Sequence, residues 1–274
     1  MEINGSQTVA LPLGSDASPG HTRSVWLLLT LNLAGKFVAL AIFPVSLPTA
    51  LALWFLPDAL LAYHLFSPGS QGLVRTCRSF KTSKKEVWLT IDDGPDPADT
   101  PKILAALKKH QARATFFVIG KNAAAHPELI RAIVEAGHEI GHHTHTHPAG
   151  SFWCASSVRL NRELDDGLTT LRILNVFPSR FRPPVGIKNL WLAPALAKRQ
   201  LTCIGWSARG LELRGGEATA VAARVLRGVR PGSILLLHEG PQVPSSIRVE
   251  AIERTVARLR ERGYTCVVPT PEQT

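Results

Sequence analysis

Residues 87–97 read VWLTIDDGPDP, an apolar run that ends abruptly in two carboxylates and a Gly-Pro turn. The first five residues have the β-branched and aromatic composition of a buried strand. Asp92 and Asp93 therefore stand at the rim of a hydrophobic core, where an unpaired carboxylate costs free energy. Two carboxylates in such a place indicate a cation or a proton to be handled, so the stretch predicts a functional site.

The composition limits the class of protein. The chain has 274 residues, of which 45% are hydrophobic and 19% charged, enough for one large domain or a domain with an appendage. A formal charge of +10 suits an anionic membrane surface or a phosphate-bearing partner, and an ordinary basic surface with no such partner is an equal alternative. The sequence has no zinc-finger spacing, RNP-like run or basic helix with interleaved aromatics. We therefore expect no nucleic-acid partner.

The N-terminal quarter of the chain differs from the rest. Residues 1–23 are polar and unpatterned, and we expect a flexible tail. In the apolar stretch 24–66 the only formal charges between Val25 and Phe66 are Lys36 and Asp58. This stretch is far longer than the ~20 residues that cross a bilayer, so it predicts a membrane segment in contact with lipid.

The membrane segment could consist of one helix or two. Pro44 and Pro48 bracket a turn that would divide it into two short spans, with Lys36 snorkelling or facing the neighbouring span. The alternative is one kinked span over residues 37–61. A cleaved signal peptide fits less well, because the preceding tail is long and the apolar run continues past the small residues at its centre.

Basic residues follow the membrane segment in a predicted linker, residues 67–85. They are Arg75, Arg78, Lys81, Lys84 and Lys85, whereas the N-terminal tail offers only Arg23. The positive-inside tendency then places the C-terminal part in the cytoplasm, on an inner membrane of the bacterial type. The alternative is that these charges belong to the folded domain and carry no topological signal.

From residue 86 to residue 274, apolar runs alternate with amphipathic segments. Strands are predicted at 86–91, 114–120, 138–143, around 181–184, 201–207, 233–238 and 265–269, with helices between most of them. This alternation predicts a parallel α/β sheet or barrel. Chemistry in such folds sits where strands end in loops, and Asp92, Asp93, His143 and His238 all fall there.

The second informative stretch is GHHTHTHP, residues 141–148. His143 and His147 are four residues apart, a spacing that would place both imidazoles on one side of a helical turn, within reach of one metal ion. A single histidine of this kind is more often structural. The pair taken together with Asp93 predicts a metal site.

Five motifs in order resemble those of the polysaccharide deacetylases, the NodB-homology carbohydrate esterases of family 4. They are TIDDGP at 90–95, HTHTH at 143–147, FRPPVG at 181–186, a Trp-containing strand and LLLH at 235–238. The resemblance covers roughly residues 86–270. It implies a distorted (β/α) barrel of the NodB-homology type for residues 86–274, preceded by the membrane-embedded helical segment.

The resemblance also implies roles for single residues. Asp92 matches the general base, and Asp93, His143 and His147 match the ligands of one divalent metal ion. Such a mixed oxygen and nitrogen set suits zinc, with cobalt or nickel as alternatives. His238 matches the general acid that protonates the departing amine.

Further positions are carried over from the same motifs. Arg182 matches the arginine that orients the base, and Leu236 lies near the pocket for the acyl methyl group. Pro184 and Trp206 are expected to contact substrate.

The fourth motif departs from the family pattern. The stretch WSARGLEL at 206–213 places Glu212 where relatives have the aspartate that orients the catalytic histidine, Arg209 where they have another aspartate, and Leu213 where they have a tryptophan. Glu212 could orient His238 from one methylene farther away. Arg209 adds positive charge near the sugar site, which predicts a substrate unlike plain chitin.

The expected function is a metal-dependent hydrolase that removes an N-acetyl or related small acyl group from an amino sugar of a glycan or glycolipid. One alternative is a catalytically silent glycan-binding or scaffold protein of the same fold. Another is an O-acetyl esterase, because the same site would serve both reactions.

Overall fold

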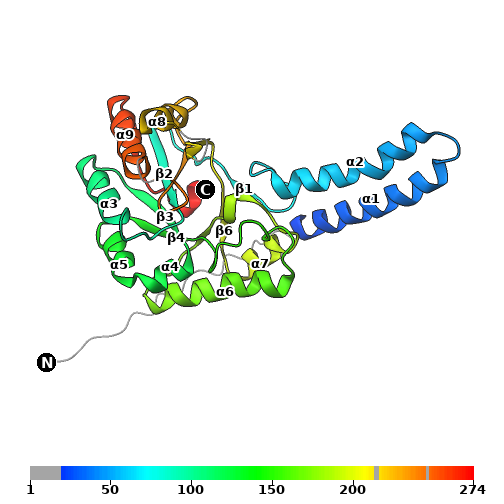
Figure 1. Ribbon diagram of the computed structural model, residues 1–274, viewed down its shortest axis with the longest axis horizontal. Coiled ribbons are helices and arrows are strands. Elements are labelled where there is room, and N and C mark those ends of the chain that lie inside the picture. The colour runs from blue at the N-terminus through cyan, green and yellow to red at the C-terminus, as the bar shows by residue number, and fades with distance from the viewer. Residues whose placement is uncertain (1–19, 213–215, 245–246) are drawn as a thin grey trace.

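The structure is a computed structural model that describes residues 20–212, 216–244 and 247–274, and it divides into a helical hairpin and an α/β body (Figure 1). Most of the predicted tail therefore lies outside the described residues. The hairpin consists of α1 (Gly20–Ile42) and α2 (Leu47–Phe66), which lie side by side and project from the body. The predicted membrane segment thus forms two helices rather than one kinked span.

Both hairpin helices are long and apolar enough to cross a membrane. Pro48 lies in the first turn of α2, where its missing N–H costs no helical hydrogen bond. Large apolar side chains such as Phe37 and Leu56 point outward and are exposed, as the side chains of lipid-facing helices are. Lys36 faces the neighbouring helix, where its Nζ lies 2.8 Å from Oδ1 of Asp58.

The body is a curled, parallel sheet covered by helices on its outer side (Figure 1). The strands are β1 (Thr76–Cys77), β2 (Glu86–Asp92), β3 (Ala114–Val118), β4 (Glu139–His142), β5 (Arg180–Phe181), β6 (Thr202–Ile204), β7 (Ala208–Arg209), β8 (Ile234–His238) and β9 (Thr265–Cys266). Their order is β1-β6-β5-β4-β3-β2-β8-β7, and β9 pairs with the start of β2. The expected distorted barrel is confirmed: the sheet is curled into an open half-barrel in which β3 and β2 are the central strands.

The helices of the body follow the strands that they cover. They are α3 (Thr100–Lys109), α4 (Gly120–Ala125), α5 (Pro127–Glu135), α6 (Ser157–Ile173), α7 (Leu192–Lys198), α8 (Ala218–Leu226) and α9 (Arg248–Glu261). One core cluster joins β2, β3 and β8 to α3, α5, α8 and α9, and a second fills the space under α6 and α7. Sequence patterning predicted most of these elements but missed α4, β1 and β7, which are too short to show a period.

The register of the sheet aligns the ends of the strands. Asp92 at the end of β2 lies opposite His238 of β8, and Val118 at the end of β3 lies opposite His142 of β4. Because all these strands are parallel, the residues that follow them meet at one edge. The edge gathers the residues that the sequence singled out.

The segment 67–85, expected to be a basic linker, is folded onto the body. Its strand β1 pairs with β6, and Leu73, Val74 and Phe80 are buried. The hairpin is therefore joined to the body by packed chain.

Candidate active site

Asp92 is held in a buried ion pair at the end of β2. Its Oδ1 accepts a hydrogen bond from Nη1 of Arg182 at 2.6 Å, and both side chains are almost fully enclosed. The guanidinium also donates to Thr90 Oγ1 and to the carbonyls of Ile204 and Gly205. These four hydrogen bonds hold the guanidinium in place, so the arginine fixes one carboxylate oxygen of Asp92 and leaves the other directed at the site.

Three side chains meet beside this pair. The Nε2 atoms of His143 and His147 lie 3.4 and 3.3 Å from Oδ1 of Asp93, and their rings are 4.9 Å apart. The expectation of a helical turn at these histidines is wrong. His143 directly follows β4, and His147 has a positive φ of 53°, so an irregular loop brings the two rings together.

The three side chains fit a divalent cation. Oδ1 of Asp93 is buried and has no hydrogen-bond partner among the described residues, although it faces two imidazole nitrogens. His143 turns its Nδ1 to the carbonyl of Arg182 at 2.7 Å, which leaves Nε2 with a free lone pair toward Asp93. Burial, then the neighbouring His143, lower the pKa of His147 to about 4, so its imidazole is neutral as a ligand must be. One carboxylate and two imidazoles with ligand atoms within 4.8 Å of one another are a donor set that zinc accepts.

The histidine loop is held by residues that sequence analysis missed. Glu163 of α6 accepts hydrogen bonds from the backbone N–H of His145 at 3.1 Å and of Thr146 at 2.8 Å, and from the Thr146 hydroxyl at 2.5 Å. The first two N–H groups of α4 donate to the carbonyls of Thr144 and His145. No motif in ELDD, residues 163–166, indicates this contact, because it joins segments that meet only in the folded chain.

Glu212 supports His238 from the neighbouring loop. Its Oε1 lies 3.1 Å from Nδ1 of His238 and accepts the backbone N–H of the same residue at 3.0 Å. Burial disfavours the charged imidazole, but the hydrogen bond and charge of Glu212, with Asp92 and Asp93, outweigh it and raise the pKa of His238 to about 9. The extra methylene of the glutamate therefore does not prevent the contact. Leu213 lies outside the described residues.

The predicted substrate-binding residues surround this edge. Leu236 lies two residues before His238 on β8, so both point to the same face of the sheet. Pro184 is buried in a short 3₁₀ turn after Arg182. Trp206 is half-buried, whereas Arg209 is exposed with its guanidinium carbon 6.0 Å from the centre of the Trp206 ring.

Glu239 is a second residue that sequence analysis missed. It directly follows His238, is fully buried, and its Oε2 accepts a hydrogen bond from Thr100 at 2.5 Å. Burial, with smaller contributions from Asp96 and Asp99, raises its pKa to about 8. A Cβ at Gly94 would lie 1.8 Å from Oε1 of Glu239, so only glycine fits after the two aspartates.

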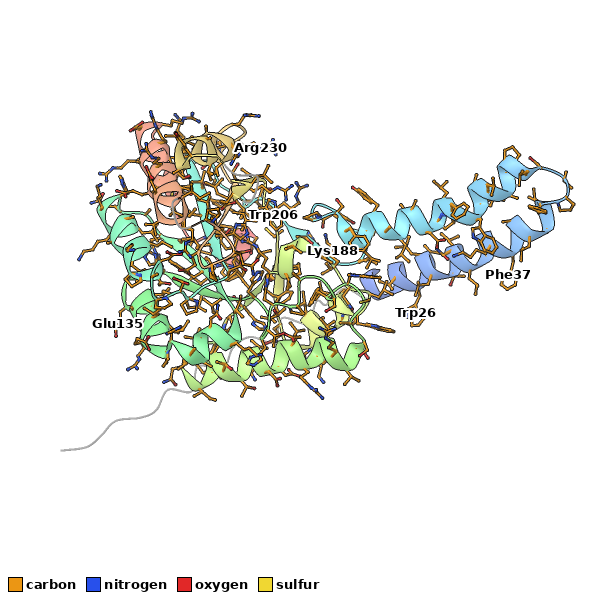
Figure 2. The ribbon with its side chains drawn as sticks, in the orientation of Figure 1. Trp26, Phe37, Glu135, Lys188, Trp206 and Arg230 are labelled. Atoms are coloured by element: carbon orange, nitrogen blue, oxygen red, sulfur yellow. The ribbon has the colours of Figure 1, made fainter. Side chains whose placement is uncertain are left out.

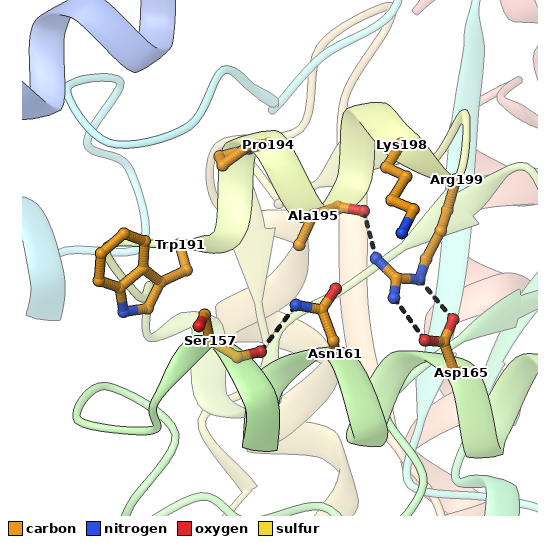
Figure 3. Close-up of a pocket in the computed structure, with 8 residues that line it drawn as sticks. All are labelled: Ser157, Asn161, Asp165, Trp191, Pro194, Ala195, Lys198 and Arg199. Carbon is orange, nitrogen blue, oxygen red and sulfur yellow. Dashed lines mark hydrogen bonds and ion pairs between the residues drawn. The ribbon is translucent and has the colours of Figure 1, made fainter.

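A groove of about 280 Å³ lies away from this edge, between α6 and α7 (Figure 3). Asp165 forms an ion pair with Arg199, and Asn161 donates to the Ser157 carbonyl. Asp165 and Arg199 thus neutralise each other, and the groove contains none of the predicted site residues. The strand edge is therefore the candidate active site.

Comparison with known proteins identifies relatives of this chain. The family model described as polysaccharide deacetylase matches residues 80–204. A chitooligosaccharide deacetylase from Sinorhizobium fredii is 35% identical over 202 residues, which cover 70% of this chain and 93% of the relative.

Solved structures agree with the sequence comparison. The crystal structure of a peptidoglycan N-acetylglucosamine deacetylase superposes with a TM-score of 0.66 at 30% identity, covering 72% of this chain and 92% of the other. A family 4 carbohydrate esterase pseudoenzyme from Bacillus anthracis superposes with a TM-score of 0.62 at 29% identity, covering 69% of this chain and 65% of the other. The fold alone therefore does not separate active from silent relatives.

Proposed function

This chain belongs to the polysaccharide deacetylase family, and from that premise we propose that it removes an N-acetyl group from an amino sugar of a cell-envelope glycan or glycolipid. One observation carries the proposal. The candidate base Asp92, the candidate acid His238 and the three candidate metal ligands all lie at one edge of the sheet, each with the partner its role requires.

Asp93, His143 and His147 would hold the metal, with zinc as the first choice. A bound divalent cation supplies Lewis-acid activation of water and of the amide carbonyl. Three protein ligands leave coordination positions open, as catalytic sites require.

The residues around the metal site divide the proton transfers between them. Arg182 fixes Oδ1 of Asp92, and Oδ2 is then the atom that accepts a proton from the attacking water. His238 is charged at neutral pH and turns Nδ1 to Glu212, so its Nε2 can donate a proton to the departing amine. An acid and a base kept in opposite protonation states are what amide hydrolysis needs.

The hairpin α1–α2 anchors the enzyme in the membrane in this proposal. Its outward apolar surface and the basic residues that follow it support an inner-membrane location with both ends in the cytoplasm. If residue 70 lies in the cytoplasm, a reporter that works only in the cytoplasm should be active when it is fused after this residue. Activity of a periplasmic reporter at that position would contradict the orientation.

Acetate release from a panel of N-acetylated glycans and glycolipids tests the function, with and without a chelator. Asp92→Asn should lower turnover by about 10²–10⁴-fold, the contribution of a general base, while the metal content stays that of the unmodified enzyme. Asp93→Asn should lose the metal as well. Acetate release that continues undiminished in Asp92→Asn would reject Asp92 as the base, and a metal-loaded chain that releases no acetate would favour the silent alternative.

A further inference from the structure

The end of α2 is hydrogen-bonded to the loop that follows Arg182 at the candidate site. Lys188 is fully buried, and its Nζ donates to the carbonyls of Ser67 at 2.7 Å and Pro68 at 3.0 Å, directly after α2. The Lys188 N–H donates to the carbonyl of Leu65 within α2. Figure 2 shows Lys188 at the junction of hairpin and body. The loop that begins at Arg182 is therefore held at a fixed position relative to the membrane span.

The same loop touches the chain that leaves the membrane. A Cβ at Gly186 would lie 2.6 Å from the Trp206 ring and 2.8 Å from Pro68, so no space separates them. Val185, between Pro184 and Gly186, has a positive φ of 50° and an exposed side chain. A β-branched residue in this conformation is strained, which indicates that the surrounding contacts determine the shape of the loop.

Two arginines lie beside Trp206. Arg78 donates from Nε to the Trp206 carbonyl at 3.2 Å, and its Nη1 lies against Gly69, where an added Cβ would come within 2.9 Å. Arg209 lies over the Trp206 ring. Both arginines are exposed, and neither forms an ion pair with a carboxylate in the part of the chain that the structure describes. Positive charge between a membrane helix and a sugar-facing aromatic ring suits a phosphate group.

Aromatic side chains continue the apolar surface of the hairpin onto the body. The ring centres of Phe66, at the end of α2, and Trp153 are 5.5 Å apart. Trp191 directly precedes α7 and follows Leu190, which packs against Val25, Leu65 and Leu73 at the base of the hairpin. The side chains of Phe66, Trp153 and Trp191 are 46%, 40% and 41% exposed. Exposed aromatic rings next to a membrane span are typical of the headgroup region of a bilayer.

We propose that the substrate is an N-acetylated amino sugar joined through a phosphate to a membrane lipid, with the phosphate between Arg78 and Arg209 and the sugar on Trp206. This inference rests on the proposed deacetylase function. The lipid remains in the bilayer, which Phe66, Trp153 and Trp191 contact. The hydrogen bonds of Lys188 to the end of α2 hold the candidate active site at the level of the lipid headgroups. The sugar can therefore reach the site while its lipid stays in the membrane.

The test compares two substrates with the full chain in vesicles of phosphatidylethanolamine and phosphatidylglycerol. One is N-acetylglucosamine joined through a diphosphate to a polyprenyl chain in the same vesicles, and the other is chitotetraose in solution. The lipid-carried substrate should have the higher kcat/KM. Arg78→Gln and Arg209→Gln should each lower the ratio of the two kcat/KM values by about tenfold, the loss of one charge-assisted hydrogen bond to phosphate.

Arg131→Gln is the matched control. Arg131 is exposed on α5, on the side of the body away from the hairpin, and should leave the ratio unchanged (Figure 1). Acetate release from chitotetraose with none from the lipid-carried sugar would overturn this inference and leave the deacetylase function standing. A ratio that neither arginine variant alters would also overturn it. Release from neither substrate would instead overturn the proposed function.

Discussion

At the scale of single residues, the Asp92–Arg182 pair joins the chemistry of the site to the stability of the fold. Both side chains are removed from water, and the arginine also donates to Thr90 of β2 and to the carbonyls of Ile204 and Gly205 at the end of β6. A buried charge without its partner is strongly destabilising, whereas removal of both charges is much less so. A substitution at Asp92 or Arg182 alone should therefore destabilise the fold.

Replacement of Arg182 tests this coupling. Arg182→Met should lower the free energy of unfolding by about 3–5 kcal/mol, because it leaves the Asp92 carboxylate buried without a counter-charge. Denaturant unfolding of the full chain in detergent, followed by tryptophan fluorescence, measures the loss. The double variant Arg182→Met with Asp92→Asn should recover part of it, and a double variant less stable than the single one would argue against the explanation.

The pH dependence of activity tests the His238–Glu212 contact. The pKa of His238 is raised to about 9, so the proton-donating form is present below that pH and is lost as the pH rises through it. Glu212→Gln removes the interaction that opposes the effect of burial, and the alkaline limb of kcat/KM should then move to lower pH. Glu217→Gln, an exposed change at the start of α8, is the control. An alkaline limb that stays in place in Glu212→Gln would show that His238 is not the titrating acid.

At the scale of elements, the geometry of the candidate metal site depends on a helix that contributes no candidate ligand. Glu163 lies on the buried face of α6 and fixes the loop between His143 and His147 by three hydrogen bonds. These bonds act together with those from α4 and with the hydrogen bond from the His147 N–H to Thr144 Oγ1 to place His147.

Glu163→Gln should therefore weaken metal binding without removing a ligand. Loss of a group that orients metal ligands lowers affinity by about 10–100-fold. Competition with a fluorescent chelator measures the change. Asp166→Asn, exposed on the same helix, should bind metal as the unmodified chain does. Equal affinity in Glu163→Gln and Asp166→Asn would mean that the loop keeps its shape without α6.

At the scale of the whole molecule, the hairpin and the body are one packed unit. Val25, Leu65 and Leu73 form an apolar cluster across the junction, and Lys188 adds polar contacts beside it. The two hairpin helices are joined by the Lys36–Asp58 ion pair and by a hydrogen bond from Asn32 to Asp58 at 2.7 Å. Lys36 and Asp58 are the only residues with a formal charge between Val25 and Phe66.

Removal of one member of that pair should impair membrane insertion. Lys36→Leu leaves the Asp58 carboxylate without its counter-charge in an apolar span, at a cost of about 2.5–3.5 kcal/mol for a central position. The fraction of the chain that resists alkaline carbonate extraction should fall. Lys36→Leu combined with Asp58→Leu should restore it. Full resistance of the single variant would contradict a position of the pair within the bilayer.

The sequence alone predicted the parts that local pattern encodes. The strand ending in Asp92 and Asp93, the alternation of strands and helices, and the apolar segment 24–66 are all readable because periodicity and composition act over a few neighbouring residues. The ligand set was also predicted, although the spacing of His143 and His147 suggested a helical turn that the structure replaces with a loop.

Tertiary structure alone decided which distant segments support the site. Glu163 reaches the histidine loop from 17 and 18 residues away, and Lys188 reaches Ser67 across 121 residues. Such contacts form only when the sheet and its helices have packed, and no local pattern marks them in advance. The residues proposed for the reaction therefore occur in short motifs of the sequence. Their alignment and their attachment to the hairpin require long loops to close, at an entropic cost that the burial of the core offsets.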